Sequence, residues 1–250
     1  MKKFCLSSVI ACIFAGIVFT SCNNDDDGPG VSSITSITAQ VEKGSEYDLD
    51  VVKAVMYYGA EDEYIVAEGG YKNGGFTIVL PSEVDGRYLE DIGEDMPEGI
   101  KISNASARIG AINLEGYKNE DYVDYFFHAK IEITEKVFSL IGGGFIYVDK
   151  DVTITGSYSE QTEDGINLSI TFNTLFKRGW NAMYASFSMS DKDPTITVRV
   201  VTKNPGGLKW YFAGGELDIF DLLPFQPEIL IDSAINEQKI LPKFQKSGIR

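Results

Sequence analysis

Alternation of apolar and polar residues from residue 33 onward constrains the fold of this chain more than any other feature. The clearest run is 166–173, where apolar residues alternate with Asn, Ser and Thr, and 152–155 and 195–200 repeat the pattern. Successive side chains of a strand point to opposite faces of a sheet, so each run predicts a strand with one buried and one solvated face. Turn residues such as Asn73-Gly74 separate the runs. The sequence therefore predicts an all-β fold, an antiparallel β-sandwich or partly open barrel of roughly 10 to 12 strands with little helix.

The run 123–133 contains the single histidine of the chain, and its alternation predicts where that histidine lies. Tyr125 and Phe127 belong to the predicted buried face, whereas Phe126 and His128 belong to the polar face. We therefore expect His128 to be a solvated surface residue. A histidine-dependent catalytic arrangement would have to use His128, and a general base needs a cleft and an orienting partner.

Residues 1–21 have the three parts of an export signal. Lys2 and Lys3 supply the positive start, and an uncharged, mostly apolar run follows at 9–19. This run is shorter than the ~20 residues that a membrane-spanning helix needs. The signal ends in Phe19-Thr20-Ser21-Cys22, which resembles the lipobox of bacterial lipoproteins, with Phe in place of the usual Leu. The resemblance implies cleavage before Cys22 and a membrane anchor of acyl chains, such as palmitate, on that cysteine.

The segment 22–32 is acidic and interrupted by Gly and Pro, which predicts a flexible tether. Its Asp25, Asp26 and Asp27 resemble the export signal of Bacteroidetes surface lipoproteins. That resemblance implies a protein anchored in the outer membrane and facing the outside of the cell. Residues 33–250 would then form the β-sandwich domain, or alternatively two successive β modules with a boundary near 95–105.

A second resemblance covers 53–89. The stretch from Tyr71 to Pro81 has an Asn-Gly turn, a following Phe and a strand that ends in Pro. It is similar to the transthyretin-like, carboxypeptidase-regulatory class of β-sandwich modules. The resemblance implies a module without catalytic activity.

Composition excludes several classes of function. The chain has 37 acidic and 22 basic residues, with a formal charge of −15. Phosphate recognition needs a concentrated basic surface, so we expect no nucleic-acid partner. The three cysteines are Cys5 and Cys12 in the leader and Cys22 at the anchor, which leaves no thiol for catalysis, metal binding or disulfides.

Two acidic pairs are the strongest candidates for metal ligands. Asp149 and Asp151, like Asp191 and Asp193, place two carboxylates on one side of an extended chain and could join a calcium shell. Neither pair follows the EF-hand pattern, and solvated turns are the simpler interpretation. We therefore expect no metal site and no cofactor.

Aromatic residues are the remaining candidates for ligand contacts. Phe126, Trp180 and Trp210 are the main candidates, and Tyr57, Tyr58 and Tyr211 are further ones. The sequence favours a lipoprotein that is not an enzyme and has a binding or structural role, with an unknown protein or glycan ligand. The alternatives are a glycan-binding accessory protein of a nutrient-uptake system and a carboxylate-dependent hydrolase.

Overall fold

The computed structural model describes residues 34–58, 62–92, 96–134, 137–161, 165–190 and 195–214. Within these residues the chain forms 15 β-strands and two short 3₁₀ helices and contains no α-helix. The elements in chain order are β1 (Ser36–Gln40), η1 (Gly44–Glu46), β2 (Val51–Tyr58), β3 (Asp62–Lys72), β4 (Gly75–Val79), η2 (Gly86–Tyr88), β5 (Glu90–Asp91), β6 (Ile100–Ile102), β7 (Arg108–Ala111), β8 (Asn113–Lys118), β9 (Asp121–Ile133), β10 (Val137–Val148), β11 (Val152–Gln161), β12 (Asn167–Phe176), β13 (Gly179–Ser190), β14 (Thr195–Val201) and β15 (Lys209–Phe212). The predicted all-β fold is confirmed.

The strands form one open, mixed sheet whose main path is β1-β4-β3-β2-β8-β9-β10-β13-β14-β12-β11-β6. The sandwich-like character is as expected, but two details of the prediction are wrong. The described residues hold more strands than expected, and β12 and β14 pair in parallel. The parallel pair arises because β14 inserts between the consecutive strands β12 and β13 and runs antiparallel to β13.

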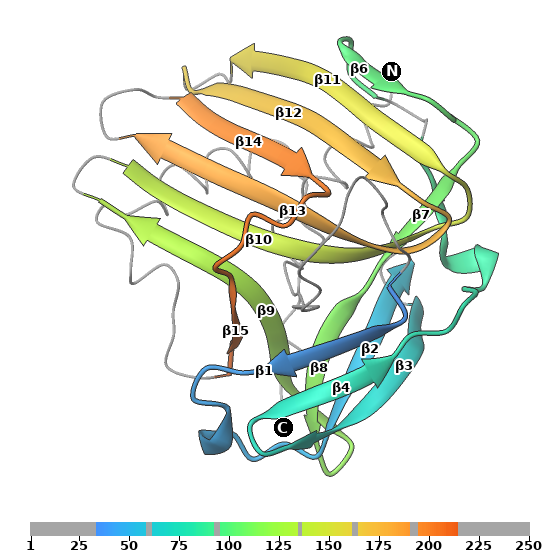
Figure 1. Cartoon of the computed structure of the whole chain (residues 1–250), viewed down its shortest axis with the longest axis vertical. Helices are drawn as coiled ribbons and strands as arrows, with labels where there is room; N and C mark the ends of the chain where they lie inside the picture. Colours follow the sequence, from blue (N-terminus) through green and yellow to red (C-terminus); the bar gives the residue numbers. More distant parts are fainter. Residues whose placement is uncertain are drawn as a thin grey trace, which may run out of the picture.

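Strand β9 joins the two halves of the sheet. Its first half, up to Phe126, pairs with β8, and its second half, from Ala129, pairs with β10. On the opposite edge its middle pairs with β15. Figure 1 shows β9 running from a small group of strands, β1 to β4 with β8, to a larger group that holds β10 to β14. We call these groups the small layer and the large layer.

The connection between β7 and β8 also runs from one layer to the other. β7 pairs with β10 in the large layer, and β8 pairs with β2 in the small layer. Between them, the backbone N–H of Ile112 donates to the carbonyl of Phe145 at 3.2 Å. One continuous stretch of chain therefore ties the two layers together.

A first core lies between the small layer and the strands β9, β10, β13 and β15. Its centre is aromatic, since the ring of Phe126 lies 5.0 Å from that of Phe76 and 4.8 Å from that of Phe212. Trp180 belongs to the same core, and its indole N–H donates to the carbonyl of Pro81 at 2.8 Å. Aromatic burial of this kind contributes both apolar area and edge contacts between rings.

A second core covers the other face of the large layer. Ile146 and Val148 of β10 point into it, whereas Phe145 and Tyr147 point into the first core. β10 is therefore buried on both faces near its end, which explains its nearly continuous apolar sequence. Part of the cover comes from Ile92 and from the segment 96–109.

Alternation correctly predicts the faces of β12 and β14 but not those of β9. Ile170 and Val198 are buried, as expected. In β9, Tyr125 is exposed, whereas Phe126, Phe127 and His128 are all buried. The expectation for Tyr125, Phe126 and His128 was wrong. Phe126 and His128 lie in the middle of β9, which is covered on both faces, whereas Tyr125 precedes the residues that pair with β15.

No helix in the part of the chain that the structure describes is long and apolar enough to cross a membrane.

Candidate binding surface

Four tyrosines gather on the outer side of the small layer, on the face of β2, β8 and β9 that points away from the first core. Strand pairing brings them together, since Tyr117 of β8 is the register partner of Tyr122 of β9. Tyr125 lies opposite Glu115, and Tyr57 lies on the neighbouring strand β2. The solvent-exposed fractions are 49% for Tyr57, 54% for Tyr122 and 38% for Tyr125. We call these four tyrosines and the central Glu115 the tyrosine face.

The turn between β8 and β9 fixes this arrangement. Asn119 and Glu120 both have positive φ angles, of 49° and 70°. A two-residue turn with positive φ at both central positions matches the twist of a β-hairpin. It keeps β8 and β9 in the register that places Tyr117 beside Tyr122, with ring centroids 5.9 Å apart.

Glu115 holds two of the rings in place. Its side chain is only 4% exposed, although it lies on the outer face of the sheet. The hydroxyl of Tyr57 donates to Oε1 at 2.5 Å, and the hydroxyl of Tyr117 donates to Oε2 at 2.8 Å. A buried carboxylate is costly unless it is hydrogen-bonded, so these two bonds stabilise both the charge and the positions of the rings.

A basic side chain completes the inner part of the face. Lys53 is the register partner of Glu115 on β2, and its Nζ lies 3.9 Å from the centroid of the Tyr117 ring. An ammonium group over an aromatic ring is attracted by the negative ring face. The tyrosine face therefore already contains one cation over an aromatic ring.

The hydroxyl groups of the face stay protonated. Burial raises the pKa of Tyr57 and of Tyr117, and the hydrogen bond to Glu115 raises both further. Burial, followed by the charge of Asp124, raises the pKa of Tyr122. Each of these hydroxyls is therefore a hydrogen-bond donor at neutral pH and not an ionised nucleophile.

Aromatic contacts extend the surface towards β15. The ring of Tyr125 lies 6.2 Å from that of Phe127, and Phe127 stacks on Tyr211 at 5.3 Å. Phe127 itself is buried, and Tyr211 is partly buried. The exposed part of the surface is therefore made by tyrosines, with Phe127 as a buried support.

The structure buries all three of the main candidate aromatics. Phe126, Trp180 and Trp210 belong to the first core. None of them can serve as an exposed platform for a ligand, so the expectation for these residues is wrong. Of the further candidates, Tyr57 belongs to the tyrosine face, and Tyr58, the next residue of the strand, is exposed on the other side of the sheet.

The alternation of single strands did not reveal Tyr117, Tyr122 and Tyr125. The signal that could have found them is the hairpin, because two strands joined by the turn at Asn119 and Glu120 place these tyrosines on one face. The register that brings the tyrosines together comes from the pairing of β8 with β9.

His128 is buried at 2% exposure instead of being solvated. Its ring stacks on Trp210, with centroids 4.9 Å apart. Burial lowers its pKa to about 4, although a hydrogen bond to the backbone of Leu208 opposes the shift. Its Nδ1 has no hydrogen-bond partner, and the same holds for Nε1 of Trp210. His128 is thus a neutral core residue at pH 7.

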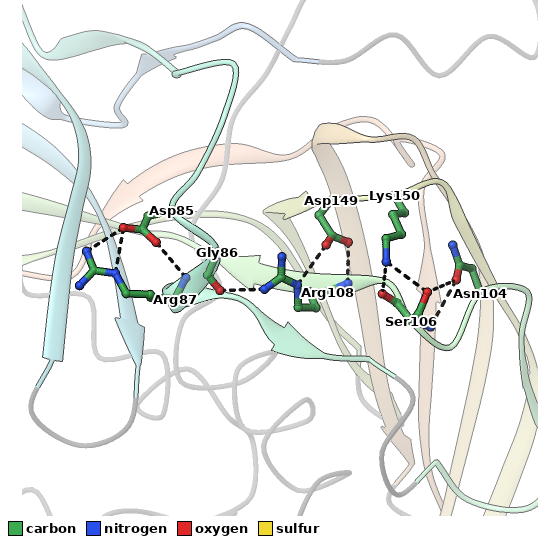
Figure 2. A network of polar contacts seen from close by, with 8 residues as sticks. All are labelled: Asp85, Gly86, Arg87, Asn104, Ser106, Arg108, Asp149 and Lys150. Carbon is green, nitrogen blue, oxygen red and sulfur yellow. Dashed lines mark hydrogen bonds and ion pairs between the residues drawn. The ribbon is translucent and has the colours of Figure 1, made fainter.

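The acidic pair at Asp149 and Asp151 is occupied by basic groups. Figure 2 shows Asp149 bound to Arg108, whose Nε lies 3.0 Å from the carboxylate and whose Nη1 reaches the carbonyl of Gly86. Asp151 accepts from Lys177 at 2.9 Å. These carboxylates tie loops to strand ends.

No group of three or more His, Cys, Asp or Glu residues suited to a metal ion occurs in the described part of the chain. Asp191 and Asp193 lie outside the described residues, as do Cys22 and the run of Asp25 to Asp27.

A shallow hollow lies at the ends of β10, β13 and β14. Its volume is about 220 Å³. It is lined by Val137, Ser188, Met189, Ser190, Thr195 and Thr197. None of these described lining side chains carries a charge.

Searches found no match to this chain among protein-family models, curated proteins or solved structures. The tyrosine face, with its exposed rings and fixed hydroxyl groups, is therefore the arrangement from which a function can be argued.

Proposed function

We propose that this chain is a lipid-anchored protein of the outer membrane, facing the outside, that binds an extracellular partner through the tyrosine face and catalyses no reaction. The exposure of Tyr57, Tyr122 and Tyr125 on one face is the observation that carries the binding role. Clustered tyrosines are typical of binding surfaces because each ring supplies a large contact area with few rotatable bonds.

Fixed rings favour binding over a merely structural role. Glu115 bonds to the hydroxyls of Tyr57 and Tyr117, so these side chains lose little freedom when a partner covers them. A buried carboxylate at this position does not strengthen the core, and an apolar residue would cost less to bury. Its role in positioning two rings accounts for its presence.

The same carboxylate is not arranged as an acid or base. Each oxygen of Glu115 already accepts a tyrosine hydroxyl. A carboxylate-dependent hydrolase needs two carboxyl groups on either side of a scissile bond, each able to exchange a proton with substrate or water. The geometry of Glu115 favours positioning over proton transfer.

The location rests on the leader and tether. Two or three acyl chains on Cys22 would anchor the protein stably, at ~0.8 kcal/mol per buried CH₂ group. The acidic balance of the chain disfavours contact with anionic lipid headgroups. The folded body would therefore stand away from the membrane and leave the tyrosine face accessible.

Anchoring and display can be tested in cells that produce the full chain. We expect labelled palmitate to be incorporated into the parent and into the matched control Cys12→Ser but not into Cys22→Ser. We also expect added protease to digest the chain on intact cells, and replacement of Asp25, Asp26 and Asp27 by Ala to protect it. Labelling of Cys22→Ser would contradict the anchor, and unchanged digestion of the triple variant would contradict the export signal.

A further inference from the structure

The tyrosine face is an open part of a sheet. Its exposed rings come from β2 and β9, with β8 between them. A partner that lies across three strands makes contacts with each of them in turn. This arrangement suits an extended polymer better than a small molecule, which needs a concave site that encloses most of its surface.

The charges of the face exclude anionic partners. Glu115 lies at the centre, Glu63 is the register partner of Tyr57, and Asp124 is close enough to Tyr122 to raise its pKa. Lys53 is held over the Tyr117 ring. A phosphate, sulfate or uronate group would meet more negative than positive charge here, in a chain whose formal charge is −15.

Polar groups lie among the rings instead of around them. The centre of a protein–protein interface is depleted of charged residues, because such residues lose water when a partner covers them. In the tyrosine face, the exposed Glu63 lies opposite Tyr57, and the partly buried Lys53 lies over the Tyr117 ring. A partner that carries its own hydroxyl groups can bond to charged groups and hydroxyls, whereas an apolar protein patch cannot.

We infer that the tyrosine face binds a neutral polysaccharide, which deepens the binding role proposed above and rests on it. The apolar C–H faces of the sugar rings would lie on Tyr57, Tyr122 and Tyr125. Sugar hydroxyls would donate to the exposed carboxylate of Glu63, the register partner of Tyr57. The position that Glu115 gives to the Tyr57 ring reduces the entropy cost of contacts with that ring.

The inference can be tested with the full chain extracted in a mild detergent. Its migration is measured in native gels that contain a β-glucan, a mannan, a xylan or starch, and in gels that contain alginate or heparin. We expect retardation by at least one neutral polysaccharide and by neither acidic one. Tyr122→Ala and Tyr125→Ala should each weaken the association by roughly five- to tenfold, as expected for loss of one aromatic contact.

Tyr58→Ala is the matched control. Tyr58 has an exposure of 45%, close to that of Tyr57, but the alternation of β2 places it on the opposite side of the sheet. Its substitution should leave retardation unchanged. Circular dichroism of all three variants establishes that each one is folded.

Three results would overturn the inference. They are no retardation in any neutral gel, retardation that Tyr122→Ala and Tyr125→Ala leave unchanged, and retardation by the acidic polysaccharides alone. Capture of a protein partner that depends on Tyr122, without any polysaccharide binding, would overturn this inference and leave the proposed binding role intact. Failure of Cys22 labelling would instead contradict the proposed location and leave the polysaccharide result intact.

Discussion

Strand β9 carries two aromatic clusters whose environments are opposite. Its first half exposes Tyr122 and Tyr125, whereas its middle buries Phe126 and His128. The residues follow one another with the same alternation, so the difference comes from the neighbours. The first half has the small layer on one edge only, whereas the middle is enclosed by the first core and by β15. Hydroxyl-bearing rings occupy the open half, and Phe lies in the enclosed part.

The two clusters also differ in the hydrogen bonding of their buried polar groups. Glu115 has a hydroxyl donor on each oxygen, whereas His128 has a backbone partner on one side and none at Nδ1. A buried polar atom without a hydrogen-bond partner lowers the free energy of unfolding. The inner cluster contains such an atom, Nδ1 of His128, whereas both oxygens of Glu115 in the outer cluster are bonded. Disturbing each cluster should therefore give distinct results.

The largest expected effect comes from emptying the inner cluster. Phe126→Ala should lower the free energy of unfolding by about 3 to 5 kcal/mol, because it removes a ring that touches Phe76 and Phe212 and leaves a cavity. Tyr125→Ala, at the adjacent position, should cost about 1 kcal/mol or less, since surface substitutions have small effects. Urea unfolding of both variants measures the difference. Equal losses would show that the two halves of β9 are not distinct environments.

The next effect is a pH dependence that belongs to the inner cluster alone. The pKa of His128 is lowered from 6.5 to about 4 in the folded protein, so the unfolded chain binds the proton first as pH falls. Above pH 6.5, His128 should therefore have no effect on the free energy of unfolding. Between pH 6.5 and 4 its contribution should lower that free energy, by about 3 kcal/mol in total.

His128→Phe provides the comparison for that prediction. Phe has a similar flat ring for stacking on Trp210 and cannot be protonated. Carboxylates such as Asp149, whose pKa is lowered by the bonds from Arg108, lose stabilisation in the same acidic range in both proteins. The difference between the two urea midpoints at pH 7 and pH 4 therefore isolates His128. If both proteins lose the same stability, the ring is not buried in its neutral form.

The positions of the strands could be predicted from the sequence, but which of their faces are buried could be predicted only in part. Alternation shows which residues share a face, and this was enough for β12, whose Ile170 and Phe172 are buried as expected. It does not show which face another layer covers, and this depends on pairings between distant segments. His128 was misplaced for that reason, although the consecutive aromatic residues Tyr125, Phe126 and Phe127 place apolar rings on both faces of the strand.

The tyrosine face shows the same limit. Tyr57 was a candidate from the sequence, but its closeness to Tyr117 depends on the pairing of β2 with β8. The parallel pairing of β12 with β14 was equally invisible, because no local pattern records that a later strand inserts between two earlier ones. Pairing between distant strands is set by the packing of the whole core and not by the local residues.

The smallest effect tests whether Glu115 positions the tyrosine rings. Glu115→Gln keeps the size of the side chain but removes the charge and leaves one acceptor oxygen. The free energy of unfolding should decrease by about 1 kcal/mol, the net worth of a single hydrogen bond. Burial raises the pKa values of Tyr57 and Tyr117 most, and the bond and charge of Glu115 raise them further, so both values should fall part of the way towards 10 in this variant. A pH titration followed by phenolate absorbance measures this shift.

Glu63→Gln is the control for that titration. Glu63 raises the pKa of Tyr57 and Tyr117 through its charge alone, whereas Glu115 also bonds to both hydroxyls. Glu63→Gln should therefore also lower the pKa values of Tyr57 and Tyr117, but by less than Glu115→Gln does. Because the folded pKa values lie above 10, the parent should lose stability as pH rises past 10, and Glu115→Gln should lose less. Identical curves for the two variants would mean that the hydroxyl bonds to Glu115 do not hold the rings, and the outer cluster would then be no more fixed than an ordinary surface.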